Sequence, residues 1–284
     1  MPQNLRTLKS RIRTAKNIAQ LAKTLEMVSV AKIRKARVLA ETVRPYAERI
    51  TSLGDTAIRA VGPGEFVHPY LAERPGNRVL LVIGPDKGLC GPLVSNLVRK
   101  MFDEDSQDSR LITVGKRMEG PAARIAGNRL VASFPVGSRL PEYSLVYDLV
   151  LAINGLILSG QATRLDVVYT RFVSYFTQVP TVDHVLPLVP EAEPEGPEAE
   201  RPHTIEPDLA GLLEALLPHY LEVRLFDAVI QAYSSEHGAR MVAMQNAKKN
   251  ALEIADSFTL LYNKTRQERI TNEILDLANT GKKA

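Results

Sequence analysis

The chain has 284 residues, of which 45% are hydrophobic, 24% charged and 6% aromatic, so it resembles an ordinary globular protein that can bury a full core. A single cysteine, Cys90, excludes an internal disulfide and a cysteine-based zinc cage. The longest uncharged stretch, 149–163, is shorter than the roughly 20 apolar residues that cross a bilayer, and we therefore expect a soluble protein.

The net charge of +4 is unevenly distributed. Residues 1–40 contain ten Lys or Arg and one acid, Glu26, which gives +9 there and leaves about −5 for the remainder. A basic, acid-poor start is also typical of mitochondrial transit peptides, but the helical pattern continues past residue 40 without a break. Such a segment suits acidic protein or nucleic acid, and the lack of aromatic residues before Tyr46 disfavours base stacking.

Apolar residues recur every 3.5 residues over 5–50, at twelve of the fourteen positions of this register. The pattern predicts a long helix in a left-handed coiled coil, with Pro45 as a local kink. Its alanines predict a close approach of the partner helix. The predicted seam consists of Leu5, Leu8, Ile12, Ala15, Ala19, Ala22, Glu26, Ser29, Ile33, Ala36, Ala40, Val43, Ala47 and Ile50.

The middle of the chain changes to short β-branched runs at 78–84, 110–115 and 165–173, with a further strand expected within 177–189. Helical stretches at 93–102 and 143–160 lie between them. Continuous apolar strands that alternate with helices predict an α/β unit on a largely parallel sheet.

Residues 190–207 hold five Pro and six Glu without apolar periodicity and indicate a solvated linker. Helical periodicity resumes after it, is interrupted at Pro218, and ends in a second seam. We predict four segments: an N-terminal coiled-coil helix (1–60), a Rossmann-like α/β domain (75–190), an acidic Pro-rich linker (191–207) and a C-terminal coiled-coil helix (208–284). The second seam consists of Met244, Ala247, Ala251, Ile254, Phe258 and Leu261.

The two terminal helices can cover each other's seams. The predicted fold is therefore α/β, with a long antiparallel two-helix coiled coil formed by the N- and C-terminal helices and an inserted Rossmann-like domain. Beyond 261 the apolar residues shift to another face of the helix, at Ile270, Ile274 and Leu277, so this tip should meet a different surface.

Candidate reactive sites are weak. The segment 84–96 lies between a predicted strand and helix, as phosphate loops do, but it matches neither the Walker nor the dinucleotide pattern. We interpret it as a tight turn and Cys90 within it as a structural thiol. The five histidines show no metal-binding spacing.

The segment 234–250 places Glu236, His237 and Arg240 ahead of Met241 and Met244. Neighbours on a helix point about 100° apart, so Glu236 and His237 do not act easily on one atom. Arg240 is one turn beyond Glu236 and can pair with it, and methionines at helical spacing usually pack. We therefore expect contacts here and no catalysis.

The segment "SEHGARMVAMQNAKKNA", followed by "LLYNKTRQERITNEILDL", closely resembles the C-terminal signature of the gamma subunits of F-type ATP synthases. "LKSRIRTAKNIAQLAKTLEMVSVAKIRKAR" is similar to their N-terminal shaft helix, and "DKGLCGPLVSN", "ITVGKR" and "FTQVPTVDHVLPL" are similar to internal blocks. The resemblance covers nearly the whole chain. Leu25, Val30 and Gly238 depart from the usual residues, and Cys90 alone lacks the regulatory pair of the chloroplast form.

The resemblance implies a central rotor shaft that couples proton flow through a membrane ring of c subunits to the conformational cycle of catalytic beta subunits, in ATP synthesis or hydrolysis. It implies a non-catalytic subunit without cofactor or metal, peripheral on the cytoplasmic face of the cell membrane. Its implied partners are the ring of alpha and beta subunits, epsilon and the c-ring, with membrane contact only through the c-ring and no nucleic acid. The implied ring contacts are Lys23, Met27, Arg240, Arg266, Gln267, Ile270, Thr271, Ile274 and Leu277.

Two other functions remain open at this point. A coiled-coil nucleic-acid-binding protein would use the basic first helix, and a small α/β enzyme with helical arms would use the middle domain.

Overall fold

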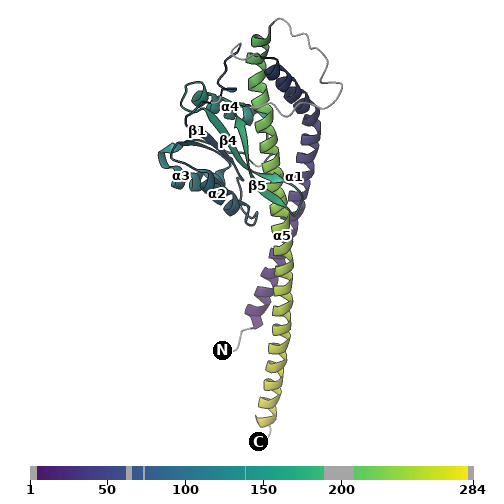
Figure 1. The fold of residues 1–284 in the computed structure, drawn as a ribbon. Coiled ribbons are helices and arrows are strands. Elements are labelled where there is room, and N and C mark those ends of the chain that lie inside the picture. The colour runs from purple at the N-terminus through teal and green to yellow at the C-terminus, as the bar shows by residue number, and fades with distance from the viewer. Residues whose placement is uncertain (1–4, 62–65, 73, 138, 189–207, 281–284) are drawn as a thin grey trace. The chain divides into compact units, whose positions relative to one another are not determined.

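The computed structural model describes residues 5–61, 66–72, 74–137, 139–188 and 208–280. Two long helices, α1 (Leu5–Ala60) and α5 (Leu209–Thr280), enclose an α/β segment in the sequence (Figure 1). The predicted fold class is confirmed. Both helices continue through an internal proline, Pro45 in α1 and Pro218 in α5, although the sequence pattern predicts an interruption at Pro218. In the part of the chain that is described, no helix is long and apolar enough to cross a membrane.

Residue contacts divide the chain into two compact units, and both long helices contribute to each. Unit 1 contains Met1–Ser29 and Arg240–Ala284, and unit 2 is Val30–Ala239. The four segments predicted from the sequence follow chain order instead, and their boundaries stay a prediction. The acidic linker at 191–207 lies outside the described residues.

In unit 1 the two helices pair antiparallel through the predicted seam of α1. Every seam position from Leu5 to Ser29 is buried or half-buried. Lys248 Nζ lies 2.7 Å from Glu26 Oε2, and the Arg11 guanidinium lies 5.6 Å from the centre of the Phe258 ring, so positions later in α5 meet positions earlier in α1.

The predicted seam of α5 is wrong at two positions. Ile254 and Leu261 are 49% and 36% exposed, whereas Ala255 is 1% exposed and faces the interior of the pair. The middle of the opposing α1 seam is formed by Ala15, Ala19 and Ala22. Two helices with small side chains at the contact approach more closely than two with an isoleucine between them. The sequence pattern placed Ile254 in the seam because isoleucine is more hydrophobic than alanine. The close contact between the helices instead favours the smaller side chain of Ala255.

In unit 2, α1 and α5 are again in contact. A Cβ at Gly54 would collide with the Tyr220 ring, and the Tyr220 hydroxyl donates to Asp55 Oδ1 at 3.2 Å. Since glycine removes the side chain where the two helices meet, the bulky Tyr220 can lie against the backbone of α1.

Unit 2 contains a five-stranded sheet in the order β3-β2-β1-β4-β5. Its strands are β1 (Arg78–Ile83), β2 (Ser109–Val114), β3 (Leu130–Phe134), β4 (Arg164–Phe172) and β5 (Gln178–Leu186). Pairing is parallel throughout except between β4 and β5, which are antiparallel. The predicted strands are confirmed, and the nearly uniform burial of β1 and β2 explains their continuous apolar sequence.

The two faces of the sheet have separate cores. Leu80 and Val82 point to one face, where α2 (Leu93–Glu104) and α3 (Lys116–Ala126) pack. Leu81 and Ile83 point to the other, against α4 (Tyr143–Ile157) and the unit 2 part of α5. The predicted helices at 93–102 and 143–160 are confirmed. The sequence missed α3, which contains Gly120 and Pro121, and the short edge strand β3.

At the carboxyl edge of the sheet, Asp86 joins three loops. Its Oδ1 accepts hydrogen bonds from the backbone N–H of Lys116 at 2.9 Å and Val136 at 3.1 Å, and its Oδ2 accepts from that of Gly137 at 2.7 Å. Gly115, with φ +96°, precedes α3 and lies so close to Gly84 that a Cβ would collide with the Gly84 carbonyl oxygen. The ends of β1, β2 and β3 are thus fixed by one carboxylate and one glycine.

We expect Asp86→Ala to lower the free energy of unfolding of unit 2 by about 3 kcal/mol, because three backbone donors lose a charged acceptor. Asp86→Asn keeps one acceptor oxygen and should cost less. Urea unfolding followed by tyrosine fluorescence reports on this unit, since eight of the nine tyrosines lie in 30–239. The control is Asp103→Ala, an exposed acid on α2. Equal midpoints for Asp86→Ala and the control would contradict the assignment.

We expect reversal of one charge of the Glu26 and Lys248 pair to destabilise unit 1 by about 1 kcal/mol at low salt, with recovery in the double reversal. The pair is partly buried, with side chains 21% and 31% exposed, so solvent screens it only in part. Loss of helical circular dichroism on heating is the measurement. The matched control is the pair Lys249 and Glu253, 4.0 Å apart and 75% and 64% exposed, whose reversal should have little effect. Absence of recovery in the double variant would contradict the pairing.

Candidate functional site

The surface of unit 1 carries most of the residues that the sequence singled out. In an antiparallel helix pair, the residue preceding each seam position lies on the same side of the pair in both helices, and the residue following it lies on the opposite side. The pair therefore has two flanks. Their chemistry differs.

Along residues 18–28 of α1, the side of the pair that precedes the seam is apolar, and we call it the apolar flank. Its α1 residues follow the spacing 3, 4, 3, and they are between 37% and 65% exposed. Ile254 and Leu261 of α5, which were predicted for the seam but are exposed, lie on the same side. The apolar flank consists of Ile18, Leu21, Leu25, Val28, Ile254 and Leu261.

The opposite side, the polar flank, carries charged and amide side chains with two apolar residues among them. It consists of Lys9, Arg13, Lys16, Gln20, Lys23, Met27, Gln245, Leu252 and Asp256, all exposed. Three lysines and one arginine against one acid leave it basic. A partner that surrounds unit 1 would therefore meet an apolar surface from one side and a basic surface from the other.

The predicted contact residues fall into two groups on unit 1. Lys23 and Met27 are one turn apart on the polar flank of α1, and both are exposed. Arg266 begins the second group on α5, 18 residues beyond Lys248, which corresponds to about 27 Å along a helix. The two groups are therefore separate sites along the shaft. The second group contains the exposed residues Arg266, Gln267, Ile270, Thr271 and Ile274.

The second group lies where α5 has lost its partner. Thr265 is the last half-buried position, and 266–275 are all exposed. Ile270 and Ile274, 43% and 60% exposed, are one turn apart and form an apolar pair without cover from α1. The shift of the apolar stripe that the sequence predicts is therefore present. Leu277 lies outside the residues whose side chains are described.

Arg240 differs from the other predicted contacts because it is only 7% exposed. Glu236 and His237 beside it are also buried, at 7% and 4%. The His237 ring packs edge-on against Tyr233 with centroids 4.5 Å apart. This stretch of α5 is therefore buried, and the prediction that Arg240 contacts a ring subunit finds no exposed side chain here.

Sequence reasoning did not identify the apolar flank. Its signal was present in the spacing of Ile18, Leu21, Leu25 and Val28, each one residue ahead of a seam position. Such residues broaden the apolar stripe of a helix and are usually taken as part of its buried face. Only the narrow, alanine-based contact with α5 leaves them in solvent.

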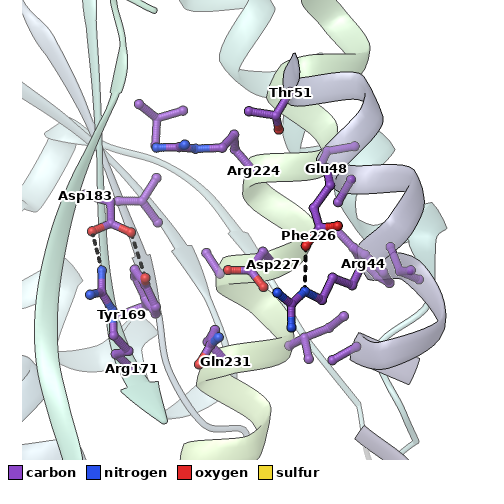
Figure 2. A pocket seen from close by; sticks show the side chains of 18 of the residues that line it. Arg44, Glu48, Thr51, Tyr169, Arg171, Asp183, Arg224, Phe226, Asp227 and Gln231 are labelled. Carbon is purple, nitrogen blue, oxygen red and sulfur yellow. Dashed lines mark hydrogen bonds and ion pairs between the residues drawn. The ribbon is translucent and has the colours of Figure 1, made fainter. Parts of the chain in front are cut away.

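A cleft of about 1160 Å³ lies in unit 2 between α1, the β4 and β5 face of the sheet, and α5 (Figure 2). Several of its charged side chains pair with one another. Arg44 Nε lies 2.7 Å from Glu48 Oε1, Arg171 Nη2 lies 3.1 Å from Asp183 Oδ1, and the Tyr169 hydroxyl donates to Asp183 Oδ2 at 2.7 Å. Groups already engaged in this way are poor ligands for a nucleotide or metal.

Burial raises the pKa of Tyr169 to about 12, so its hydroxyl stays a proton donor at neutral pH. Burial also raises the pKa of Asp227, opposed by its hydrogen bond with Gln231. Within the described ranges, no group of three or more His, Cys, Asp or Glu is arranged to hold a metal ion.

The turn after β1 does not form a phosphate loop. In doubly wound sheets, phosphates bind at the carboxyl edge against backbone amides at a helix N-terminus. Here Asp86 already accepts hydrogen bonds from three backbone amides at this edge, one of which, that of Lys116, lies at the start of α3. Cys90 is 2% exposed and packs with Leu93 and Ala239, as expected of a structural thiol.

Comparison with solved structures agrees with this fold. Chains in two structures of the Euglena gracilis mitochondrial ATP synthase superpose with TM-scores of 0.70 and 0.66 at 18% identity. The superpositions cover 98% and 94% of this chain and 93% and 98% of the other. At this identity the likeness concerns the fold alone.

Sequence comparison identifies the family. A family model described as ATP synthase matches residues 4–283. The ATP synthase gamma chains of Dehalococcoides mccartyi and Roseiflexus castenholzii are 36% and 39% identical to this chain over 278 and 289 residues, with 96% of each chain covered. The chain belongs to the ATP synthase gamma chain family.

Proposed function

We propose that this chain is the central rotor shaft of an F-type ATP synthase. Proton flow through a membrane ring turns the shaft, and the turning shaft drives the catalytic beta subunits through successive conformations. The chain itself carries out no chemistry. Its partners are the ring of alpha and beta subunits around unit 1, and epsilon and the c-ring at the globular part.

The observation that carries this proposal is the unlike chemistry of the two flanks of unit 1. A shaft that turns inside a ring must present a different surface to each beta subunit at any moment. The apolar flank and the basic polar flank provide that difference, because apolar contact is short-ranged whereas charge acts over about a Debye length. As the shaft rotates, each beta subunit meets first one flank and then the other.

The exposed predicted contacts fit this role. Lys23 on the polar flank and Arg266 on the free end of α5 suit acidic loops of beta subunits, since exposed charges can be exchanged at small cost. Ile270 and Ile274 suit an apolar sleeve around the tip. Arg240 is buried, and we propose that it stabilises the shaft instead of touching the ring.

The rival functions have less support. The basic charge of α1 is arranged on a helix that pairs with α5, and the family comparison gives no support to nucleic-acid binding. An α/β enzyme that binds a nucleotide would need an open anion site at the carboxyl edge of the sheet, where Asp86 already accepts hydrogen bonds from the amides. The membrane association that we propose runs through the c-ring, on the cytoplasmic face of the cell membrane.

Reconstitution tests the proposal directly. We expect the purified chain, mixed with alpha and beta subunits of the same synthase, to enter one complex and to raise its ATPase activity. Size-exclusion chromatography and steady-state hydrolysis measure the two effects. If the chain neither enters the complex nor changes the rate, the rotor function is wrong; nucleotide turnover or salt-sensitive DNA binding by the chain alone would favour a rival.

The contact at the free end of α5 is tested by the double variant Arg266→Ala, Gln267→Ala. We expect ATPase activity of the reconstituted complex to fall roughly fivefold, which corresponds to about 1 kcal/mol of lost contact. The matched control is Asn263→Ala, Lys264→Ala, an amide and a cation on the same exposed helix. The α/β fold should remain intact in both, as judged by near-ultraviolet circular dichroism. Equal activity and assembly of the two variants would remove Arg266 and Gln267 from the contact.

A further inference from the structure

The cleft between α1, the sheet and α5 in unit 2 has no part in the proposed function. Its volume of about 1160 Å³ is enough for a drug-sized molecule, since pockets that hold such ligands measure roughly 300–1,000 Å³. Apolar side chains form part of its wall, among them Val43 of α1, Val182 of β5 and Val223 of α5. This wall can take up the apolar part of a ligand, and the charged groups of the cleft decide what else the ligand must carry.

The carboxylates that α1 and the sheet present to the cleft have partners within its wall. Two of them pair with an arginine one turn away on α1, one accepts from a tyrosine hydroxyl of α5, and one binds both an arginine and a tyrosine of the sheet. These groups are Glu41 with Arg37, Glu48 with Arg44, Asp55 with Tyr220, and Asp183 with Arg171 and Tyr169. Each of these negative charges is already compensated or hydrogen-bonded.

Asp227 of α5 is the exception. Its side chain is exposed to the cleft, and within the described ranges it forms no ion pair. Its hydrogen-bond partner is the neutral amide of Gln231, one turn further along α5. The Gln231 Oε1 in turn accepts the backbone N–H of Phe172 at 3.2 Å, which orients the amide. Figure 2 shows Asp227 between the Arg44 side of α1 and the sheet.

The negative charge of Asp227 is only partly compensated. Burial raises the pKa of Asp227, whereas the hydrogen bond with Gln231 and the charge of Arg224 act in the opposite direction, and Asp183 adds repulsion. The effect of Arg224, the cation nearest in sequence, is thus already included in the net upward shift. A cation that entered the cleft would stabilise the charged carboxylate, so Asp227 favours a positively charged ligand.

We propose that the cleft of unit 2 binds a small organic cation, which places an ammonium, amidinium or guanidinium group on Asp227 and an apolar body against the valines of the wall. The site lies within this chain and uses no contact with another subunit, so it is independent of the rotor function. Both α1 and α5 line the cleft together with the sheet. A ligand that binds only the folded state therefore stabilises unit 2 by mass action.

Other kinds of ligand fit the cleft less well. Metal ions such as Ca²⁺ take six to eight oxygen ligands, and in the described part of the chain no group of three or more His, Cys, Asp or Glu is arranged to hold a metal. An organic anion would have to compete with Glu48 for Arg44 and with Asp183 for Arg171. A cation meets a carboxylate that has no such competitor.

Binding of benzylamine to the full chain tests the proposal. Benzylamine carries a protonated ammonium group on an apolar ring, and benzyl alcohol and benzoate present the same ring without charge and with a negative charge. Isothermal titration calorimetry measures the affinity. Thermal unfolding followed by tyrosine fluorescence measures the stabilisation of unit 2, which contains eight of the nine tyrosines.

We expect benzylamine to bind and to raise the unfolding temperature, and both other compounds to bind about tenfold more weakly, which corresponds to about 1.4 kcal/mol. Asp227→Asn keeps the shape of the side chain but removes its charge, so it should weaken benzylamine binding about tenfold and leave benzyl alcohol unaffected. Asp227→Glu retains the charge and should restore most of the affinity. The matched control, Asp103→Asn on the exposed surface of α2, should bind as the unaltered chain does.

The site within unit 2 is located by a second variant. Ala47 lines the cleft from α1, so Ala47→Leu should fill part of it and weaken benzylamine binding without any change of charge. The matched control is Thr42→Leu, an exposed position of α1 that does not line the cleft. Unchanged binding by Ala47→Leu would place the ligand elsewhere and overturn the proposal.

Four further results would also overturn it. They are the absence of benzylamine binding by the unaltered chain, equal binding by Asp227→Asn, equally tight binding of benzyl alcohol, which would make the cleft purely apolar, and preferred binding of benzoate, which would make the arginines the anchor. Far-ultraviolet circular dichroism checks that each variant is folded. Because the Asp227 side chain is exposed, we expect its variants to fold normally.

Discussion

The close approach of two helices through small side chains is the constraint on which the rest depends. In unit 1 the middle of the α1 seam consists of Ala15, Ala19 and Ala22, and α5 turns Ala255 toward α1 in place of Ile254. A narrow contact uses little apolar surface, so larger residues on each side remain exposed. The apolar flank exists for that reason.

Unit 2 shows how a nucleotide-binding type of sheet can serve as a rigid body. The order of strands is that of doubly wound folds that bind phosphates at the carboxyl edge of the sheet, but here Asp86 supplies the anion from within the chain. Three strand ends are thereby tied to one carboxylate. Several charged groups of the cleft between α1 and the sheet are likewise paired internally. The unit is suited to transmit force and to dock partners.

The surfaces of the molecule differ in the lifetime of contact that they favour. The polar flank and the free end of α5 carry exposed charges, whose interactions are weak individually and long in range. The apolar side chains exposed on the outer face of α4, such as Tyr147 and Leu151, can interact only at close range, because apolar contact requires desolvation. A rotor needs both kinds of surface, because it must slide against one set of subunits and stay fixed to another.

Periodicity along the sequence was sufficient for the long α1 seam, the four longer strands and the helices α2 and α4, because each is recorded in neighbouring residues. It also located the exposed tip at Ile270 and Ile274 through the change of phase. Three features were decided only by tertiary structure. The choice of Ala255 over Ile254 depends on the size of side chains on another helix. The helix α3 contains Gly120 and Pro121, which are poor helix formers, so its sequence alone does not indicate a helix. The burial of Arg240 depends on packing that its local sequence does not record. Hydrophobic spacing predicts which face of an element is buried, but how closely its partner approaches decides how wide that face becomes.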